Sequence, residues 1–444
     1  MAFDTSLKYA ILGIARSGIA AAYKIKELGG EVFLSDSAPV DRVVIRAELV
    51  QDFECEFGGH SKRLFDCACW IVSPGIPLDI EILNKARAKG IELISEIEFG
   101  YRIKAPDSRI IAVTGSNGKS TTASLIHHLL QSLGKNSILA GNIGAAFCSF
   151  PIHLPGIEYI VLEISSFQID LIQSFAPQVA ILLNLSPDHL NRYPSYEAYC
   201  LSKMRIFENQ SAADYAIYFR DSEQTLKLLP DLAAQQLCFS MDNPLADAYL
   251  KGKEIIIGQE RLNTDKLIIK GPHNYQNLMA ALLAIKAIGG NLKKAVDACY
   301  TFKGLSHRLE YVDTIRGVKF YNDSKATNCD SVKSALNSFE VPIRIIMGGS
   351  DKGEDFGQLT PLLKQKAQKV YITGATLSRM QEAWEGKLDL ALEPDFDAAV
   401  KLAFAEALPG ESIVLSPACA SFDRFQNFEE RGEYFKDLVR GLKA

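Results

Sequence analysis

The decapeptide Val-Thr-Gly-Ser-Asn-Gly-Lys-Ser-Thr-Thr at residues 113–122 constrains the fold of this chain more than any other feature. It follows a short apolar run and precedes the helix-like stretch 123–133. A glycine turn between a strand and a helix directs backbone N–H groups and the positive helix end toward an anion. Lys119 adds a positive charge for the terminal phosphates, and Ser120 or Thr121 supplies a hydroxyl for Mg²⁺. The sequence therefore predicts a nucleoside triphosphate site in an α/β domain.

This decapeptide departs at one position from the common phosphate-loop pattern, because Val113 stands where that pattern has its first glycine. A chance glycine turn with an exposed lysine is the alternative interpretation. Gly-Lys-Ser at a strand-to-helix junction is specific enough to favour phosphate binding over that alternative.

The length of the chain predicts several domains, since 444 residues exceed what one hydrophobic core ordinarily holds. Short apolar runs alternate with helix-like stretches, which is typical of α/β domains with parallel sheets. We expect three domains, each built on a mostly parallel sheet: a Rossmann-like N-terminal domain, a P-loop-type central domain and a Rossmann-like C-terminal domain. Their expected bounds are 1–98, 99–304 and 305–444.

Charge and cysteine content narrow the class of protein. A net charge of −5 and the lack of a basic block give little support for nucleic-acid binding. No apolar run is long enough to span a bilayer, and the first residues do not read as a signal peptide. The nine cysteines are scattered, without the paired spacing of a zinc site. We therefore expect a reduced, cytoplasmic monomer that is not inserted in a membrane.

Residues 9–36 read as a βαβ nucleotide-binding unit, with a glycine-containing turn at 13–18 and Asp36 at the end of the second strand. Ala15 replaces the middle glycine of the dinucleotide fingerprint, so the pattern favours a diphosphate in general over NAD in particular. A later strand leads into the rigid turn Ser73-Pro74-Gly75. Ligand contact and an ordinary loop remain equal alternatives for that turn.

Two strand ends in the central segment carry polar residues. Glu163 ends the apolar run 159–163. A carboxylate there, in the same domain as a phosphate loop, is the usual place for a Mg²⁺ ligand. Asp188 and His189 follow the next strand. A lone histidine is more often structural, but two polar residues at this edge favour a site.

The segment from Gly271 to Asn277 starts the helix that we expect over 278–288, and Pro272 suits a helix start. Asn274 and Asn277 are three residues apart and so lie on one helix face. Both amides can meet one ligand there, or they can simply cap the helix.

The last part of the chain again alternates strands with helices. Polar residues follow three of its expected strands, at 321–328, 348–353 and 416–423. This arrangement predicts another parallel sheet with polar residues at its carboxyl edge.

Taken in this order, the motifs resemble the Mur ligase family of peptidoglycan synthesis over nearly the whole chain. The matching motifs are 114–121, Glu163 with Ser165-Ser166, His189, 273–277, His307-Arg308 and 322–328. The stretches 322–328 and 415–421 match best the branch that adds D-glutamate, and the Asp-Asn-Pro-Arg motif of the diaminopimelate- and lysine-adding branches is absent.

The resemblance implies an enzyme that uses ATP to join D-glutamate to UDP-N-acetylmuramoyl-L-alanine through an acyl phosphate. It implies a UDP-binding N-terminal domain, a central ATPase domain and a C-terminal domain for the amino acid. The expected cofactors are ATP and Mg²⁺, with two ions. Because ATP and amino-acid contacts fall on different segments, catalysis is expected to require closure of the domains, which also excludes water from the acyl phosphate.

The resemblance also assigns roles to residues. The ATP contacts are Gly115, Ser116, Asn117, Gly118, Lys119, Ser120, Thr121, Asn277, Arg308 and Asp323. The UDP-substrate contacts are Ser17, Asp36, Ser73 and Asn142. The D-glutamate contacts are Lys325, Thr327, Lys352, Ser421 and Phe428. The metal ligands are Ser120, Glu163, His189 and a carbamylated Lys203, and the catalytic residues are Lys119, Glu163, His189 and Lys203.

Three of these assignments carry alternatives. Lys203 is otherwise an ordinary solvated lysine, and Phe428 is otherwise part of a hydrophobic core. In some family members the glycine pair at 348–349 is followed directly by aspartate, whereas here Ser350 precedes Asp351. We therefore place more weight on Lys352 than on Asp351 in that turn.

Other functions compete with this interpretation. Folylpolyglutamate synthetase is a related amide ligase, but it lacks an N-terminal domain such as residues 1–98 predict. A Mur ligase that adds another amino acid is a second alternative. A nucleotide-dependent switch without ligase activity is a third, and it would make the polar clusters of the last segment incidental.

Overall fold

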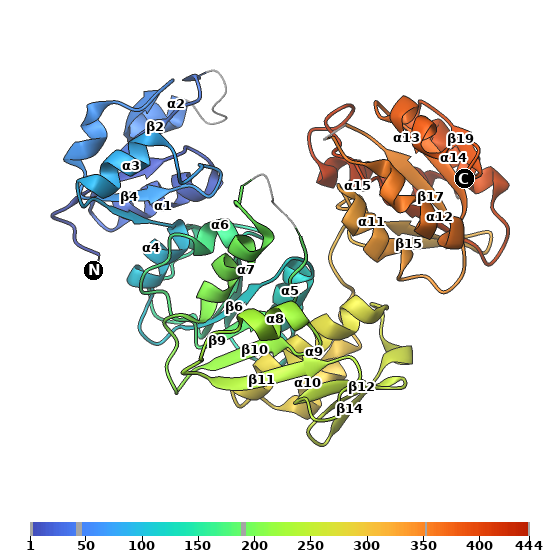
Figure 1. Cartoon of the computed structure of the whole chain (residues 1–444), viewed down its shortest axis with the longest axis horizontal. Coiled ribbons are helices and arrows are strands. Elements are labelled where there is room, and N and C mark those ends of the chain that lie inside the picture. The colour runs from blue at the N-terminus through green and yellow to red at the C-terminus, as the bar shows by residue number, and fades with distance from the viewer. Residues whose placement is uncertain (1–2, 41–46, 188–191, 351–352, 443–444) are drawn as a thin grey trace. The chain divides into compact units, whose positions relative to one another are not determined.

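The computed structural model describes residues 3–40, 47–187, 192–350 and 353–442. Within these ranges the chain forms three β-sheets. It divides into two compact units: the first holds Met1–Leu267 and Tyr275–Thr301, and the second holds Ile268–Asn274 and Phe302–Ala444. The first two sheets belong to the first unit, and the third sheet belongs to the second (Figure 1).

The first sheet, blue in Figure 1, has five parallel strands in the order β3-β2-β1-β4-β5. Its strands are β1 (Lys8–Leu12), β2 (Glu31–Asp36), β3 (Glu54–Phe57), β4 (Cys69–Val72) and β5 (Glu92–Ile94). Its helices are α1 (Arg16–Glu27), α2 (Ala47–Asp52), α3 (Glu81–Ala88) and α4 (Glu96–Ile103). The βαβ unit predicted at the start of the chain is confirmed as β1-α1-β2.

The second sheet has nine strands in the order β14-β13-β12-β11-β10-β9-β6-β8-β7. The strands are β6 (Arg109–Thr114), β7 (Ser137–Gly141), β8 (Tyr159–Glu163), β9 (Val179–Leu182), β10 (Tyr215–Phe219), β11 (Gln235–Ser240), β12 (Ala248–Lys251), β13 (Glu254–Ile257) and β14 (Glu260–Asn263). In this spatial order, each pair of neighbouring strands from β12 at one side to β7 at the edge is parallel. At the other side, β12 pairs with β13 and β13 pairs with β14, both antiparallel, and these strands form a meander that the sequence analysis did not predict.

Six helices accompany this sheet: α5 (Lys119–Ser132), α6 (Ser166–Ile169), α7 (Tyr196–Met204), α8 (Glu223–Leu228), α9 (Pro272–Ala287) and α10 (Leu292–Cys299). Side chains of Ser165 and Ser195 accept hydrogen bonds from first-turn N–H groups and so start α6 and α7. The predicted start of α5 at 123 was too late, because this helix begins at Lys119. The α9 helix begins at Pro272, the proline expected to suit a helix start.

The third sheet has six strands in the order β15-β16-β20-β17-β18-β19, with only the β15–β16 pair antiparallel. Its strands are β15 (Glu310–Ile315), β16 (Val318–Asn322), β17 (Ile343–Gly348), β18 (Ala367–Thr373), β19 (Leu390–Leu392) and β20 (Ser412–Leu415). Its helices are α11 (Cys329–Leu336), α12 (Thr360–Lys366), α13 (Leu377–Trp384), α14 (Phe396–Glu406) and α15 (Phe428–Gly441).

The hydrophobic cores follow the two units. One continuous core contains Ile11 of the first sheet and Ile160 of the second. In the third sheet, Ile345 and Ile346 are consecutive residues of β17 and belong to two different cores. Because successive strand residues point to opposite faces, this sheet is buried on both sides, as parallel sheets usually are.

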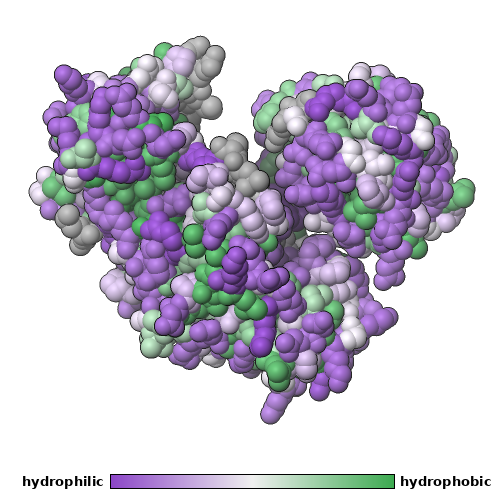
Figure 2. All heavy atoms as spheres, viewed as in Figure 1, coloured by the Kyte–Doolittle hydropathy of each residue, from purple (hydrophilic) through white to green (hydrophobic). Residues whose placement is uncertain are grey.

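The predicted fold class, α/β with three mostly parallel sheets, is confirmed. The domain bounds at 98 and 304 stay a prediction, and residue 98 lies inside α4. The face drawn in Figure 2 is mostly hydrophilic, with apolar side chains scattered over it. Across the described ranges, the structure contains no helix whose length and apolar character would let it traverse a bilayer.

Candidate active site

The phosphate loop lies between β6 and α5, as the sequence predicts. Gly118 is the N-cap of α5 with φ 85°, and a Cβ atom there would lie 2.3 Å from the Asn277 side-chain oxygen. Only glycine fits both the backbone conformation and this close approach. The Lys119 ammonium group donates to the backbone carbonyls of Gly115 (2.9 Å) and Ser116 (2.8 Å), so it folds back over the loop.

Residues after β9 brace this loop from the side. The Asn117 N–H donates to the Asn184 side-chain oxygen at 2.8 Å, and the Asn184 amide donates back to the Asn117 carbonyl at 3.0 Å. The Ser116 hydroxyl lies 2.9 Å from the Ser186 carbonyl and 3.0 Å from the Tyr199 hydroxyl. The loop is therefore held in shape by contacts that the sequence pattern alone did not reveal.

Glu163 stands at the end of β8, where the sequence predicts a Mg²⁺ ligand. One of its carboxylate oxygens accepts a hydrogen bond from the Asn142 amide at 2.8 Å. Its other oxygen is buried and has no hydrogen-bond partner in the described part of the chain. A buried carboxylate oxygen without a donor is what a hard cation can satisfy. Ser120 of the phosphate loop is also buried, and its hydroxyl is, like the Glu163 carboxylate, an oxygen donor of the kind that Mg²⁺ prefers, so the donor types fit a magnesium ion.

Lys203 lies near the C-terminus of α7 and is 2% exposed. The ordinary interpretation as a solvated lysine was therefore wrong. Its ammonium nitrogen is 4.7 Å from the centroid of the Tyr199 ring, and the Tyr199 hydroxyl contacts Ser116 of the phosphate loop. Tyr199 thus connects the lysine to the phosphate loop.

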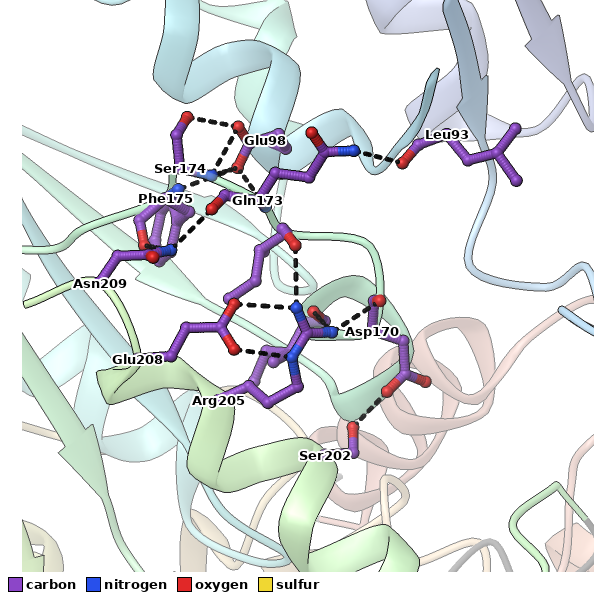
Figure 3. Close-up of polar contacts among 12 residues, drawn as sticks. Leu93, Glu98, Asp170, Gln173, Ser174, Phe175, Ser202, Arg205, Glu208 and Asn209 are labelled. Atoms are coloured by element: carbon purple, nitrogen blue, oxygen red, sulfur yellow. Dashed lines mark hydrogen bonds and ion pairs between the residues drawn. The ribbon is translucent and has the colours of Figure 1, made fainter. Parts of the chain in front are cut away.

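The C-terminal end of α7 is fastened to the loop after α6 (Figure 3). The Ser202 hydroxyl donates to Asp170 at 2.5 Å. The Arg205 guanidinium donates to the carbonyls of Ile169, Asp170 and Ile172 and pairs with Glu208. These bonds fix α7, and with it Lys203, against the segment that follows Glu163.

The predicted UDP-substrate contacts lie around the first sheet's carboxyl edge and the turn after β7. Asp36 accepts from the N–H groups of Ile14 (2.6 Å) and Ala38 (2.8 Å). The buried Ser73 hydroxyl donates to the Gly13 carbonyl at 2.7 Å, so the 73–75 turn is joined to the turn after β1. Ser17 is half-buried in the first turn of α1.

Asn142, the fourth predicted UDP-substrate contact, belongs to the second sheet and lies beside Glu163. A neighbouring contact links its turn to the first sheet, because the Arg16 guanidinium donates to the Gly144 carbonyl at 2.9 Å. The start of α1 and the 141–144 turn are therefore in contact. An extended ligand can reach both elements.

Asp323 and Arg308 lie together in the second unit. The Asp323 carboxylate accepts from the Leu309 N–H (3.1 Å) and the Ser416 hydroxyl (2.8 Å). Burial raises the pKa of Asp323 to about 7, while the Ser416 bond and the Arg308 charge oppose that rise. The Arg308 Nε atom is buried and finds no hydrogen-bond partner among the described residues.

His273 also belongs to the second unit. Burial, with a contribution from the Arg308 charge, lowers the pKa of His273 to about 4. Asn274, which follows it, donates from its side chain to the Lys270 carbonyl at 2.8 Å. Asn277 instead accepts from the Thr122 hydroxyl of α5 at 3.1 Å. The two amides thus have different protein contacts, and the idea that both meet one ligand stays a prediction.

Two predicted D-glutamate contacts meet directly. The Lys325 ammonium nitrogen is 5.7 Å from the centroid of the Phe428 ring. Phe428 is half-buried at the first position of α15, and its ring is in a T-shaped pair with the His307 ring, with the two ring centroids 6.2 Å apart. Thr327 is half-buried and Ser421 is buried.

The side chain of Arg431 in α15 stabilises this region, and the sequence analysis did not predict that role. Its buried guanidinium donates to the carbonyls of Cys419, Ala420 and Ser324 and to the Ser324 hydroxyl. Burial lowers its pKa to about 10. It thereby holds the 419–421 turn against the 323–325 turn. The sequence did not indicate this role, because an arginine in an amphipathic helix is ordinarily an exposed surface residue. Of the predicted residues, His189 and Lys352, with Asp188 and Asp351, lie outside the described ranges.

The fold and the phosphate loop together define a P-loop-type α/β protein with three sheets. Three family models match the chain: "MurD N-terminal domain" at residues 8–82, "Mur ligase middle domain" at 113–285 and "Mur ligase, glutamate ligase domain" at 307–419. The chain belongs to the Mur ligase family.

Relatives resemble the chain over its full length. The UDP-N-acetylmuramoylalanine--D-glutamate ligase of Cytophaga hutchinsonii is 43% identical over 98% of this chain and 99% of its own. The protein of the same name from Koribacter versatilis is 38% identical over 97% of both chains. Among solved structures, the UDP-N-acetylmuramate-alanine ligase MurC of Thermotoga maritima aligns with a TM-score of 0.62 at 18% identity, covering 98% of this chain and 100% of its own.

The Thermotoga maritima MurF ligase, solved in complex with ADP, aligns with a TM-score of 0.61 at 16% identity over 98% of this chain and 95% of its own. At such low identity these two structures bear on the fold alone. They agree with the three-sheet α/β architecture described above.

Proposed function

We propose that this protein is a ligase that uses ATP to join D-glutamate to UDP-N-acetylmuramoyl-L-alanine, a step of peptidoglycan precursor synthesis in the cytoplasm. The observation that carries the proposal is the similarity, over 98% of the chain, to a relative with that ligase name. The phosphate loop and the buried, unpartnered Glu163 oxygen support it independently, because the first suits a nucleotide phosphate and the second suits a cation. We expect a monomer that works in three domains, bounded near residues 98 and 304.

The reaction first makes the substrate carboxylate a better electrophile. An oxygen of the alanyl carboxylate attacks the γ-phosphorus of ATP, the bond to ADP breaks, and an acyl phosphate forms. The D-glutamate amine then attacks the acyl carbon through a tetrahedral intermediate. The amine loses a proton, phosphate leaves with the oxygen that it received from the carboxylate, and an amide remains.

Charge is the main obstacle to the first step, since a carboxylate must approach a triphosphate. Positioned cations reduce that repulsion and stabilise the charge that spreads over the transferring phosphoryl group. Lys119 is proposed to move from its carbonyl contacts onto the β- and γ-phosphates. Ser120 and Glu163 are proposed to hold Mg²⁺, which neutralises phosphate charge when bound. His189 is proposed to help hold a second ion or to contact the acyl phosphate.

Lys203 is proposed to carry a carbamate whose oxygens bind Mg²⁺. Its burial beside Tyr199 supports the idea, because a lysine withdrawn from water is more readily neutral and then reacts with CO₂. Incubation with ¹³C-bicarbonate should give a carbamate carbon resonance that is lost in Lys203→Met and kept in Lys24→Met, a second buried lysine. Absence of the resonance in active, metal-loaded protein contradicts the carbamate.

D-glutamate is proposed to bind in the second unit. Lys325, held above the Phe428 ring, supplies a positive charge for a dicarboxylate. The remaining proposed contacts are Thr327, Lys352 and Ser421. Arg308 and Asp323 are proposed to contact ATP with Asn277, and Arg308 has a buried Nε–H group still able to donate. Ser17, Asp36, Ser73 and Asn142 are the proposed UDP-substrate contacts.

The amino-acid partner is tested by measuring ADP release with a panel of amino acids. We expect release to require both UDP-N-acetylmuramoyl-L-alanine and D-glutamate. Release that depends instead on L-alanine or diaminopimelate would assign the chain to another branch of the family. Release without any amino acid would favour a nucleotide-dependent switch.

A further inference from the structure

Arg192 connects two parts of the first unit that carry different proposed ligands. It follows the segment containing Asn184 and Ser186, which brace the phosphate loop, and it precedes α7, which carries Lys203. Its side chain reaches the turn after β4, where Ser73 is a proposed UDP-substrate contact. No step of the reaction described above assigns Arg192 a task.

The contact is a clamp on three consecutive carbonyl groups. Arg192 Nη1 donates to the Gly75 carbonyl at 3.0 Å, and Nη2 donates to Pro74 at 3.0 Å and also to Ile76. A guanidinium is a rigid planar fork with several N–H donors, so one side chain can hold all three oxygens at fixed positions. A lysine ammonium is a point charge on a flexible stem and lacks that geometry.

Both sides of the clamp are themselves fixed. The guanidinium carbon lies 4.6 Å from the centroid of the Phe167 ring in α6, and Phe167 stacks on Tyr193. The Tyr193 hydroxyl donates to Asp170 at 2.7 Å, and Asp170 also accepts from Ser202, the residue before Lys203. Arg192 is therefore attached to the elements that follow Glu163 and carry Lys203.

On the other side, the turn is tied to the first sheet. The Ser73 N–H donates to the Leu12 carbonyl at 2.8 Å, and its hydroxyl donates to the Gly13 carbonyl at 2.7 Å. The Ile76 N–H closes the turn on the Ser73 carbonyl at 3.0 Å. The hydrogen bonds from Arg192 to the carbonyls of residues 74–76 therefore also fix the position of Ser73 and of the turn after β1.

We infer that Arg192 is a positioning residue that sets the separation between the UDP-substrate turn and the phosphate loop. The inference rests on the proposed function, since it requires one ligand on each side. The alanyl carboxylate must lie in line with the γ-phosphate, and a misplacement of about 1 Å lowers the rate of such a step about 10²-fold. Arg192 touches neither proposed ligand and acts through the carbonyls that it holds.

The test compares Arg192→Lys with wild type and with Arg87→Lys. Arg87 donates to the Leu78 carbonyl a few residues farther along the same connection but is exposed and reaches nothing in the second sheet among the described residues. We expect Arg192→Lys to lower kcat about 10²-fold while the ATP dissociation constant changes less than about twofold. Arg87→Lys is expected to match wild type.

Hydrogen exchange gives a readout that does not depend on turnover. The backbone N–H groups of residues 73–80, except Pro74 and Pro77 which have none, should exchange faster in Arg192→Lys than in wild type, with the thermal unfolding midpoint unchanged. Arg192→Gln keeps two N–H donors. Its exchange rates and its kcat should therefore lie between those of wild type and those of Arg192→Lys.

The outcomes separate the two proposals. If wild type turns over and Arg192→Lys matches it in kcat and exchange, the positioning role of Arg192 is contradicted and the proposed function stands. If kcat falls only together with the unfolding midpoint and with ATP affinity, Arg192 is a general structural residue and the inference fails. If wild type does not release ADP with both substrates, the proposed function fails and the positioning role fails with it.

Discussion

The side chain of Lys119 is where a single substitution should have the largest effect. Its ammonium group donates to two carbonyls of its own loop, and its side chain is not part of a hydrophobic core, so its removal should leave the core untouched. Loss of one positioned charge at a transferring phosphoryl group typically lowers turnover about 10²- to 10³-fold. We predict that Lys119→Ala loses turnover by at least that factor while its circular dichroism and unfolding midpoint match wild type. Steady-state kinetics of the two proteins check this, and near-normal turnover would contradict the role of Lys119.

The buried carboxyl group of Glu96 leads to a prediction about how the stability of the protein depends on pH. One of its oxygens accepts from the Cys148 N–H at 2.6 Å, and the other is buried without a hydrogen-bond partner among the described residues. Burial raises the pKa of Glu96 to about 7, from an ordinary 4.5. The folded state therefore binds this proton more tightly than the unfolded state, and stability falls as pH rises from about 4.5 to about 7.

We predict that Glu96→Gln removes this loss, because glutamine keeps the acceptor for Cys148 and cannot ionise. The variant should gain on the order of 2 kcal/mol over wild type at pH 8 and much less at pH 5. Unfolding midpoints at the two pH values measure the difference. Glu98 is the control of opposite sign: although burial opposes it, bonds from Gln173, Ser174 and Arg102 hold its pKa below the ordinary value, so Glu98→Gln should destabilise at pH 8.

The functional role of a single residue could be predicted only where that residue belongs to a sequence motif. The sequence correctly placed Lys119 in the turn between a strand and a helix and Glu163 at a strand end, because both belong to local patterns. Burial of Lys203, Glu96 and Arg431 depends on contacts between segments far apart in the chain. No local pattern carries that information, so their environments appeared only in the structure.

A side-chain hydrogen bond between α5 and α9 gives a prediction about two asparagines of α9. The Asn277 oxygen accepts from Thr122 of α5 and lies close to Gly118, whereas Asn274 donates to the Lys270 carbonyl. We predict that Asn277→Ala raises the ATP KM about tenfold or more, consistent with the loss of one or two hydrogen bonds. Asn274→Ala should change it less than about twofold. Equal effects of the two substitutions would contradict the assignment of Asn277 alone to the ATP site.

Elements with a strong signal were predicted well. Buried parallel strands read as continuous apolar runs, and the strand 159–163 was placed at its observed bounds. The start of α5 at Lys119 was placed too late, because the polar phosphate-loop residues obscured its first turn. The proline at the start of α9 was a clear helix-start signal. The β12–β14 meander was missed although Gly252 and Gly258, with φ of 59° and 57°, mark its two turns. Its strands have four residues each, which is too short for a clear alternation.

The proposed ligands are divided between the two compact units, and each unit has its own hydrophobic core. Lys119 and Glu163 belong to the first unit, and Lys325 and Arg308 belong to the second. Since the amine must reach the acyl carbon, we predict that ligands draw the units together. Small-angle X-ray scattering should show a smaller radius of gyration with saturating nucleotide analogue, UDP substrate and D-glutamate than without ligands. Unchanged scattering would argue against closure.

The most direct test of ligation through an acyl phosphate follows a single oxygen atom. UDP-N-acetylmuramoyl-L-alanine labelled with ¹⁸O in both oxygens of its alanyl carboxylate is incubated with ATP, Mg²⁺, D-glutamate and the protein. Mass spectrometry of the released phosphate should find one ¹⁸O atom per turnover, and the amide product should retain the other. Phosphate without the label would show that water, and not the substrate carboxylate, receives the phosphoryl group, and would contradict the proposed reaction.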